Sequence, residues 1–185
     1  MGKTIKILGI AGSLRQASYN RAALRTAVSL VPAGASLDTA EIGNLPLFSE
    51  DLEKPLPPVV AEFKAKIRAA DAILFVTPEY NYSVPGVLKN AIDWGTRPYG
   101  DNAWSGKPAA IMGASIGMFG SARAQYHLRQ IMVNLNMFPL NQPEVMIANA
   151  SQKFDQAGNL TDEPTKKFIA QLLTNLVTWA QKLGI

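Results

Sequence analysis

Five short apolar runs alternate along this chain with five longer segments whose apolar residues recur at helical spacing. Runs of this kind form strands buried on both faces, and a helix between consecutive strands makes them parallel. We therefore predict an α/β fold, a doubly wound five-stranded parallel sheet with helices on both faces. The predicted strands are residues 5–10, 37–42, 72–77, 109–112 and 145–147, and apolar residues mark helices within 24–31, 60–70, 87–92, 128–135 and 168–183.

Length and composition fit one globular domain. The chain has 185 residues, of which 48% are hydrophobic and 17% charged. A chain of this size buries most of the surface that its unfolded form exposes. Pro and Gly are spread along the sequence without forming a linker, and no internal repeat interrupts it. We expect residues 1–185 to form a single domain.

The sequence contains no cysteine. Disulfides, thiolate metal sites, iron–sulfur clusters and a cysteine nucleophile are therefore excluded. No constellation of histidine, cysteine or other metal-binding residues stands out in the sequence, so we expect no bound metal. Any redox chemistry must come from a bound cofactor.

The ends and the charge of the chain limit its partners. Two lysines precede the first apolar run, but that run enters a Gly/Ser/Arg loop without a small-residue cleavage site. No stretch approaches the ~18 apolar residues of a membrane span, so we expect a cytoplasmic protein.

The formal net charge of +4 permits anionic ligands. Lysines and arginines are scattered rather than gathered on one helix, and nucleic acid is not an expected partner.

The loop after the first predicted strand is rich in hydrogen-bond donors and opens a helix. It contains Ser13, Arg15, Ser18 and Asn20, and a helix N-terminus adds unpaired backbone N–H groups and the positive end of a dipole. We interpret this loop as a phosphate site. Neither G-x-G-x-x-G nor G-x-x-x-x-G-K-[ST] is present. Ser18 or Asn20 could instead merely cap the helix, but a cap needs no guanidinium, and Arg15 favours the phosphate.

A second unusual loop, Pro78 to Gly86, reads PEYNYSVPG and follows the third apolar run directly. Loops at the carboxyl ends of strands commonly hold ligands in doubly wound proteins. Proline ends the strand, polar and aromatic residues follow, and Pro85 suits the first turn of the next helix. This loop is a candidate ligand site.

The loop after the fourth strand, residues 113–117, matches the nucleophile elbow G-x-S-x-G of serine hydrolases. A hydrolase triad also needs a histidine, and the only one is His127. If a helix starts near Gly120, His127 lies roughly 10 Å from the loop at ~1.5 Å per residue, beyond reach of Ser115. We therefore interpret Ser115 and Gly117 as small residues beside a flat ligand, and His127 as a helix-surface or interface residue.

These loops together resemble those of the NAD(P)H-dependent FMN reductase family of flavodoxin-like proteins, with the bacterial quinone and chromate reductase branch as the nearest match. The resemblance rests on GSLR with Ser18 and Asn20, and on PEYNYSVPG followed by LKNAIDW over residues 88–94. It extends over essentially the whole chain.

The resemblance implies a flavodoxin-like sheet of strand order 2-1-3-4-5, non-covalent FMN, and ping-pong hydride transfer from NAD(P)H to a quinone or another acceptor such as chromate, an azo compound or free flavin. It also implies a homodimer or homotetramer with the site near a subunit interface. No side chain is expected to be catalytic, because hydride chemistry belongs to the cofactor. The implied phosphate ligands are Ser13, Arg15, Ser18 and Asn20, and the implied borders of the isoalloxazine are Pro78, Glu79, Tyr80, Asn81, Tyr82, Ser115 and Gly117.

A flavodoxin-type electron carrier is the alternative function. Such carriers are usually strongly acidic, which the net charge of +4 does not match.

Four further features need an interpretation. We interpret Glu79 as a carboxylate that accepts backbone N–H bonds, and Trp94 as a residue of a packing or subunit face. Arg123, Tyr126 and Glu144 could form a polar cluster, which we leave outside the site. Ser121 stands where many relatives carry glycine, which leaves the FMN expectation intact and the shape of the substrate mouth open.

Overall fold

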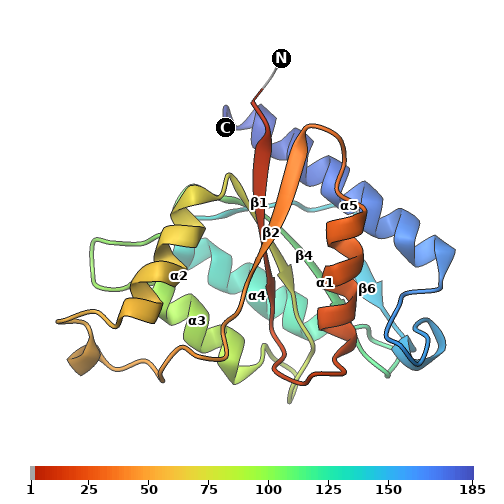
Figure 1. Ribbon diagram of the computed structural model, residues 1–185, viewed down its shortest axis with the longest axis horizontal. Coiled ribbons are helices and arrows are strands. Elements are labelled where there is room, and N and C mark those ends of the chain that lie inside the picture. The colour runs from red at the N-terminus through yellow and green to blue at the C-terminus, as the bar shows by residue number, and fades with distance from the viewer. Residues whose placement is uncertain (1–2) are drawn as a thin grey trace.

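The computed structural model describes residues 3–185, and it contains one parallel sheet between two layers of helices (Figure 1). The sheet has the order β2-β1-β3-β4, with β5 and β6 both paired to β4. This confirms the predicted doubly wound, flavodoxin-like order. The strands are β1 (Ile5–Ala11), β2 (Ala35–Ala40), β3 (Ala72–Val76), β4 (Pro108–Ala114), β5 (Phe138–Pro139) and β6 (Val145–Ile147).

The helices divide between the two faces of the sheet, as Figure 1 shows. Side chains of α1 and α5 pack on one face, and those of α2, α3 and α4 pack on the other. Alternate strand residues serve the two layers: Leu74 and Val76 face the first, whereas Ile73 and Phe75 face the second. The helices are α1 (Tyr19–Ser29), α2 (Pro58–Ala69), α3 (Gly86–Thr96), α4 (Ala122–Leu135) and α5 (Glu163–Lys182), and short 3-10 turns cover Glu50–Leu52 and Ala150–Gln152.

Two short strands, β5 and β6, share the fifth position of the sheet, where the sequence predicted a single strand. β5 pairs with the start of β4 at Pro108 and Ala109, whereas β6 pairs with its end, from Met112 to Ala114. Because β3 occupies the other side of β4, both pieces lie along the same edge. The predicted strand 145–147 is β6, and β5 is additional.

The second strand begins and ends two residues earlier than predicted, at Ala35 and Ala40 instead of 37 and 42. Its pairing with β1 runs from Ile5 opposite Ala35 to Ile10 opposite Ala40. Ile42 is buried but lies past the strand, in the loop that leads to α2. Burial without strand pairing is the reason for the shifted boundary.

Trp94 on α3 anchors that long loop. Its indole Nε1 donates to the Pro46 carbonyl at 2.7 Å, and its ring is completely buried against Phe48. Asn90, one turn earlier, accepts a bond from Phe48 N at 2.8 Å. Trp94 thus lies at a packing face, as expected. No helix between residues 3 and 185 combines the length and apolar character needed to cross a bilayer.

Candidate functional site

The loops after β1, β3 and β4 meet at one edge of the sheet, the lower edge in Figure 1. The chain leaves β1 for β2 on one side and later returns to β3 on the other, so the strand order reverses beside β1. Ligands of doubly wound proteins bind at such switch points. The three loops that carry the predicted site residues are therefore brought together.

The loop after β1 presents a row of free backbone donors. Within residues 3–185, the N–H groups of Ser13 to Ala17 donate to no protein acceptor. Ser18 caps α1: its Oγ accepts from Asn20 N at 3.2 Å and from Arg21 N at 3.4 Å. Ser13 and Ser18 are buried, whereas Arg15 is exposed near the Tyr19 ring. Consecutive free N–H groups at a helix start fit a phosphate group.

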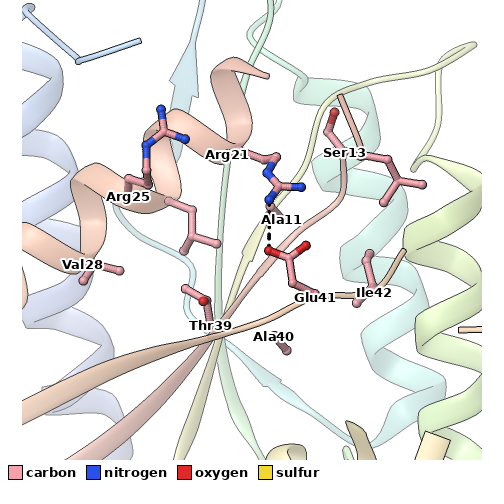
Figure 2. Close-up of a pocket in the computed structure, with 11 residues that line it drawn as sticks. Ala11, Ser13, Arg21, Arg25, Val28, Thr39, Ala40, Glu41 and Ile42 are labelled. Carbon is pink, nitrogen blue, oxygen red and sulfur yellow. Dashed lines mark hydrogen bonds and ion pairs between the residues drawn. The ribbon is translucent and has the colours of Figure 1, made fainter. Parts of the chain in front are cut away.

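Arg15 has no carboxylate partner in the described part of the chain, unlike its neighbour Arg21. Figure 2 shows Arg21 facing Glu41 across a cleft of about 230 Å³ between α1 and the end of β2. The two side chains form an ion pair at 3.0 Å. Arg15 is therefore the cation of this loop that remains available to an anionic ligand.

Asn20 reaches a different partner from the one expected for a phosphate ligand. Its Oδ1 accepts from Ala114 N at 2.8 Å, and its Nδ2 donates to Ala114 O at 2.9 Å. The side chain is buried, with 3% of the residue exposed. The amide thus joins the loop after β1 to the end of β4.

The loop after β3 closes in a tight two-residue turn. Tyr80 and Ser83 exchange two backbone hydrogen bonds of 3.0 Å, and Asn81 and Tyr82 between them have φ of 50° and 69°. Asparagine tolerates a positive φ, whereas tyrosine rarely adopts one. Strained residues of this kind cluster at ligand sites. The turn exposes the Tyr80 and Tyr82 rings, and Pro78 before it is buried.

Glu79 caps the helix that follows the next strand. Its carboxylate accepts from the backbone N–H of Arg123 at 3.0 Å and of Ala124 at 3.4 Å, and it pairs with the Arg123 guanidinium. This confirms the interpretation of Glu79 as an acceptor of backbone N–H bonds. The hydrogen bond that the Arg123 guanidinium donates to Glu79 raises the pKa of Arg123.

Arg123 therefore belongs to the site edge and not to a cluster with Tyr126 and Glu144. Its guanidinium carbon lies 3.6 Å from the Tyr82 ring centroid and 4.7 Å from that of Phe119. Tyr126 is separate: a hydrogen bond to Glu144 raises the pKa of the Tyr126 hydroxyl. Sequence reasoning missed this role of Arg123, because no local pattern connects residues 79 and 123.

The loop after β4 is held by backbone bonds and exposes apolar side chains. Ser115 N donates to Ile147 O at 3.0 Å, and Ser115 Oγ accepts from Gly117 N at 3.1 Å. Ile116, Met118 and Phe119 are each more than half exposed. Sequence reasoning did not include these three, although large apolar residues between glycines were a visible signal.

Ser121 does not reach the mouth of the site. It is 1% exposed, and its Oγ accepts from Gln125 Nε2 at 3.2 Å. A Cβ on Gly113 would lie 1.9 Å from that Oγ and 2.2 Å from Thr77 O. Ser121 thus fills the space beneath Gly113 and adds almost nothing to the outer surface of the loop.

The serine hydrolase alternative fails on geometry. The Nδ1 atom of His127 lies 3.0 Å from Ser83 Oγ, in the turn after β3. Ser115 Oγ accepts from Gly117 N, and within residues 3–185 no histidine contacts it. The G-x-S-x-G match therefore carries no catalytic triad.

Comparison with known proteins agrees with this architecture. The sequence model of the family described as NADPH-dependent FMN reductase matches residues 5–152. The chain belongs to this family. It is 55% identical over 184 residues to an NAD(P)H-dependent FMN reductase of Pseudomonas aeruginosa, with 99% of each chain covered.

Two further relatives bear names of quinone or general acceptor reductases. A 2-hydroxy-1,4-benzoquinone reductase of a Burkholderia species is 43% identical, and the match covers 96% of this chain and 97% of that protein. Among solved structures, FerB of Paracoccus denitrificans, a flavoenzyme NAD(P)H:(acceptor) oxidoreductase, superposes with a TM-score of 0.89. It is 38% identical, and the match covers 96% of this chain and 98% of FerB.

Proposed function

We propose that this protein is an NAD(P)H-dependent oxidoreductase that binds FMN non-covalently and reduces quinones. The observation that carries the proposal is the row of five N–H groups, Ser13 to Ala17, that have no acceptor within residues 3–185, together with Arg15, which has no carboxylate partner there. These donors lie at the same edge of the sheet as the strained turn after β3 and the loop after β4. Family membership and the names of the relatives support the choice of cofactor and acceptor.

The donor set fits a phosphate monoester at one end of the site. Ser13, Arg15 and Ser18 would hold the phosphate together with the free N–H groups, and Asn20 adjoins them. Bonds to an anion from a guanidinium and from backbone N–H groups just before a helix start are of the strong, charge-assisted type. Ser18 can cap α1 and still donate its hydroxyl hydrogen.

The other two loops would border the ring end of FMN. Pro78, Glu79, Tyr80, Asn81 and Tyr82 form one border, and Ser115 with Gly117 forms the other. Within residues 3–185, the N–H groups of Asn81 and Tyr82 have no protein acceptor, so they can donate to a ring edge. When bound, FMN would supply the redox chemistry, which is hydride transfer between NAD(P)H and an acceptor.

Turnover in this proposal is ping-pong: NAD(P)H and the acceptor use the same opening in turn. Quinones are the first choice of acceptor, and chromate, azo compounds and free flavin are further candidates. We propose the cytoplasm as the compartment, because NAD(P)H is supplied there. Parallel lines in double-reciprocal plots at several quinone concentrations are expected, and intersecting lines would contradict the ping-pong order.

We also propose that the protein is a homodimer or homotetramer. The exposed Ile116, Met118 and Phe119 support an interface beside the site, because apolar side chains gathered on one loop commonly mark contact surfaces. Sedimentation equilibrium of the full chain tests this part. A single monomeric species across the concentration range would contradict it.

Flavin reduction tests the proposed function most directly. The purified protein should show flavin absorption or acquire it with FMN, and anaerobic NADPH or NADH should bleach that absorption without any other protein. Reoxidation by a quinone should then follow. Bleaching only in the presence of a separate reductase would indicate the electron carrier instead, and no uptake of FMN would overturn both.

A further inference from the structure

Asn20 completes a position in the sheet that no strand occupies. The backbone groups of Met112 face β3, and the Met112 carbonyl accepts from Thr77 N at 2.9 Å. Backbone groups two residues later in a strand face the same side, so those of Ala114 also point toward β3. The paired part of β3 has already ended there, with Val76 opposite Met112.

The side-chain amide of Asn20 takes the place of the missing strand. It accepts from Ala114 N at 2.8 Å and donates to Ala114 O at 2.9 Å, as a peptide group of a neighbouring strand would. The two residues are 94 positions apart, and the contact is buried. Without it, a buried N–H and a buried carbonyl would lose their partners, which is costly.

The contact joins the two ends of the proposed flavin site. Asn20 lies in the first turn of α1, two residues beyond Ser18, whose hydroxyl caps that helix. Ala114 ends β4 and is followed directly by the loop that carries Ser115 and Gly117. Two backbone hydrogen bonds of 3.0 Å hold the other side of this loop: Ser115 N donates to Ile147 O, and Ala150 N donates to Ser115 O. The Asn20 amide holds the side of the loop that faces the proposed phosphate site.

We propose that Asn20 is a positioning residue and not a ligand of the phosphate. It sets the loop after β4 at a fixed distance from the donors of Ser13 to Ala17, and thereby shapes the border of the isoalloxazine. This inference rests on the proposed binding of FMN. It assigns to Asn20 a different role from that of Arg15, whose guanidinium forms no ion pair with a carboxylate in residues 3–185 and can therefore bind the phosphate itself.

The two roles predict different effects of a variant on the binding affinities for FMN and riboflavin. These flavins share the isoalloxazine ring, but only FMN carries the phosphate. Apoprotein of Asn20→Ala is titrated with each flavin, and binding is followed by quenching of flavin fluorescence. A positioning role weakens both flavins by the same factor, about tenfold or more for the loss of two buried bonds. The ratio of the two affinities then equals that of the unaltered protein.

Asn102→Ala is the matched control. The Asn102 amide also bonds two backbone groups, Trp104 N and Leu135 O, both at 3.0 Å. It lies near the start of β4, at the opposite end from the site. This variant should lower thermal stability while leaving the affinities of both flavins unchanged.

Two results would overturn the inference. Selective loss of FMN affinity in Asn20→Ala, with riboflavin unaffected, would make Asn20 a phosphate ligand. Unchanged affinity for both flavins in the folded variant would make its role purely structural. If the unaltered protein binds neither flavin, it is the proposed function that fails.

A measurement on the unaltered protein covers the case in which Asn20→Ala does not fold. Side-chain amide signals of the ¹⁵N-labelled apoprotein are assigned, and their hydrogen exchange is compared. The buried bond to Ala114 predicts slow exchange at Asn20 Nδ2 in the absence of phosphate, and the exchange should be equally slow when inorganic phosphate is added. Fast exchange, or exchange that becomes slow only when phosphate is added, would contradict the inference.

Discussion

The carboxylate of Glu79, in the loop after β3, caps α4 by accepting the backbone N–H of Arg123, 44 residues later. Ser121 stands at the N-cap position, but its side chain makes no capping bond, and its φ of 69° is left-handed. A carboxylate at a helix N-terminus also interacts favourably with the helix dipole. Glu79 therefore fixes the turn after β3 against the start of α4.

Replacing Glu79 should destabilise the folded protein. Only 8% of its side chain is exposed, so Glu79→Ala should lower the free energy of unfolding by about 1.5–3 kcal/mol, as expected for charge-assisted bonds. Urea denaturation followed by circular dichroism measures this. In the control Glu62→Ala, which removes an exposed pair with Lys66, the change should stay below about 0.5 kcal/mol. Equal effects of the two variants would contradict the capping role.

Removing the guanidinium of Arg15 should weaken the binding of FMN but not that of riboflavin. Arg15→Ala should weaken FMN binding by about 1.5–3 kcal/mol, because a charge-assisted bond to the phosphate is lost. Riboflavin, which has no phosphate, should bind as before. Fluorescence titration of the apoprotein measures both. Arg21→Ala is the control, because that guanidinium already pairs with Glu41; equal losses in the two variants would remove Arg15 from the site.

Ser115 should have no role in hydrolysis. Its hydroxyl accepts from Gly117 N, and His127 is occupied with Ser83. Both the unaltered protein and Ser115→Ala should therefore cleave p-nitrophenyl acetate no faster than buffer does. Release of nitrophenolate, followed by absorbance, measures the rate. Hydrolysis that disappears in Ser115→Ala would revive the hydrolase alternative.

Acid should weaken the contact between α2 and the loop before β4. The hydrogen bond from the Lys64 ammonium lowers the pKa of Asp101, and this effect outweighs the opposing effect of partial burial. Because the folded pKa lies below the unfolded value of about 3.9, the contribution to stability is complete above that value. It is lost as the pH falls through the folded pKa.

The pH dependence of Asp101→Asn tests this. Melting temperatures between pH 2 and 6 should fall less steeply in the variant than in the unaltered protein. Lys64→Met, which removes the other partner of the 2.8 Å ion pair, should flatten the curve only in part, because Arg68 also pairs with Asp101 and lowers its pKa. Parallel curves for all three proteins would contradict the assignment.

The sequence predicted the layers of the fold well because the central strands are apolar throughout. Every residue of β3 and β4 is buried, so their runs stand out without any knowledge of neighbours. The edge positions were less predictable. β5 has two residues, one of them proline, and the ends of β2 depend on its pairing with β1 and not on its own composition.

In the candidate site, too, some features could be predicted from the local sequence and others could not. Local chemistry was enough to find the loop after β1 and the turn after β3, because serines, Arg15 and the PEYNYS run are contiguous. The contacts between loops could not be predicted. Asn20 meets Ala114 and Glu79 meets Arg123 across 94 and 44 residues, and no spacing rule connects such distant positions. The roles of Asn20 and Arg123 follow from tertiary structure alone.

The broken fifth strand also affects how this protein behaves at high concentration. A sheet grows into aggregates when an edge offers a long row of free backbone groups. Here one edge is divided into β5, which contains Pro139, and the three residues of β6. The other edge, β2, carries the exposed Asp38, whose charge would repel the same strand of a second copy. Neither edge is a good template for adding strands, so copies that associate should do so through helices and loops and remain finite assemblies.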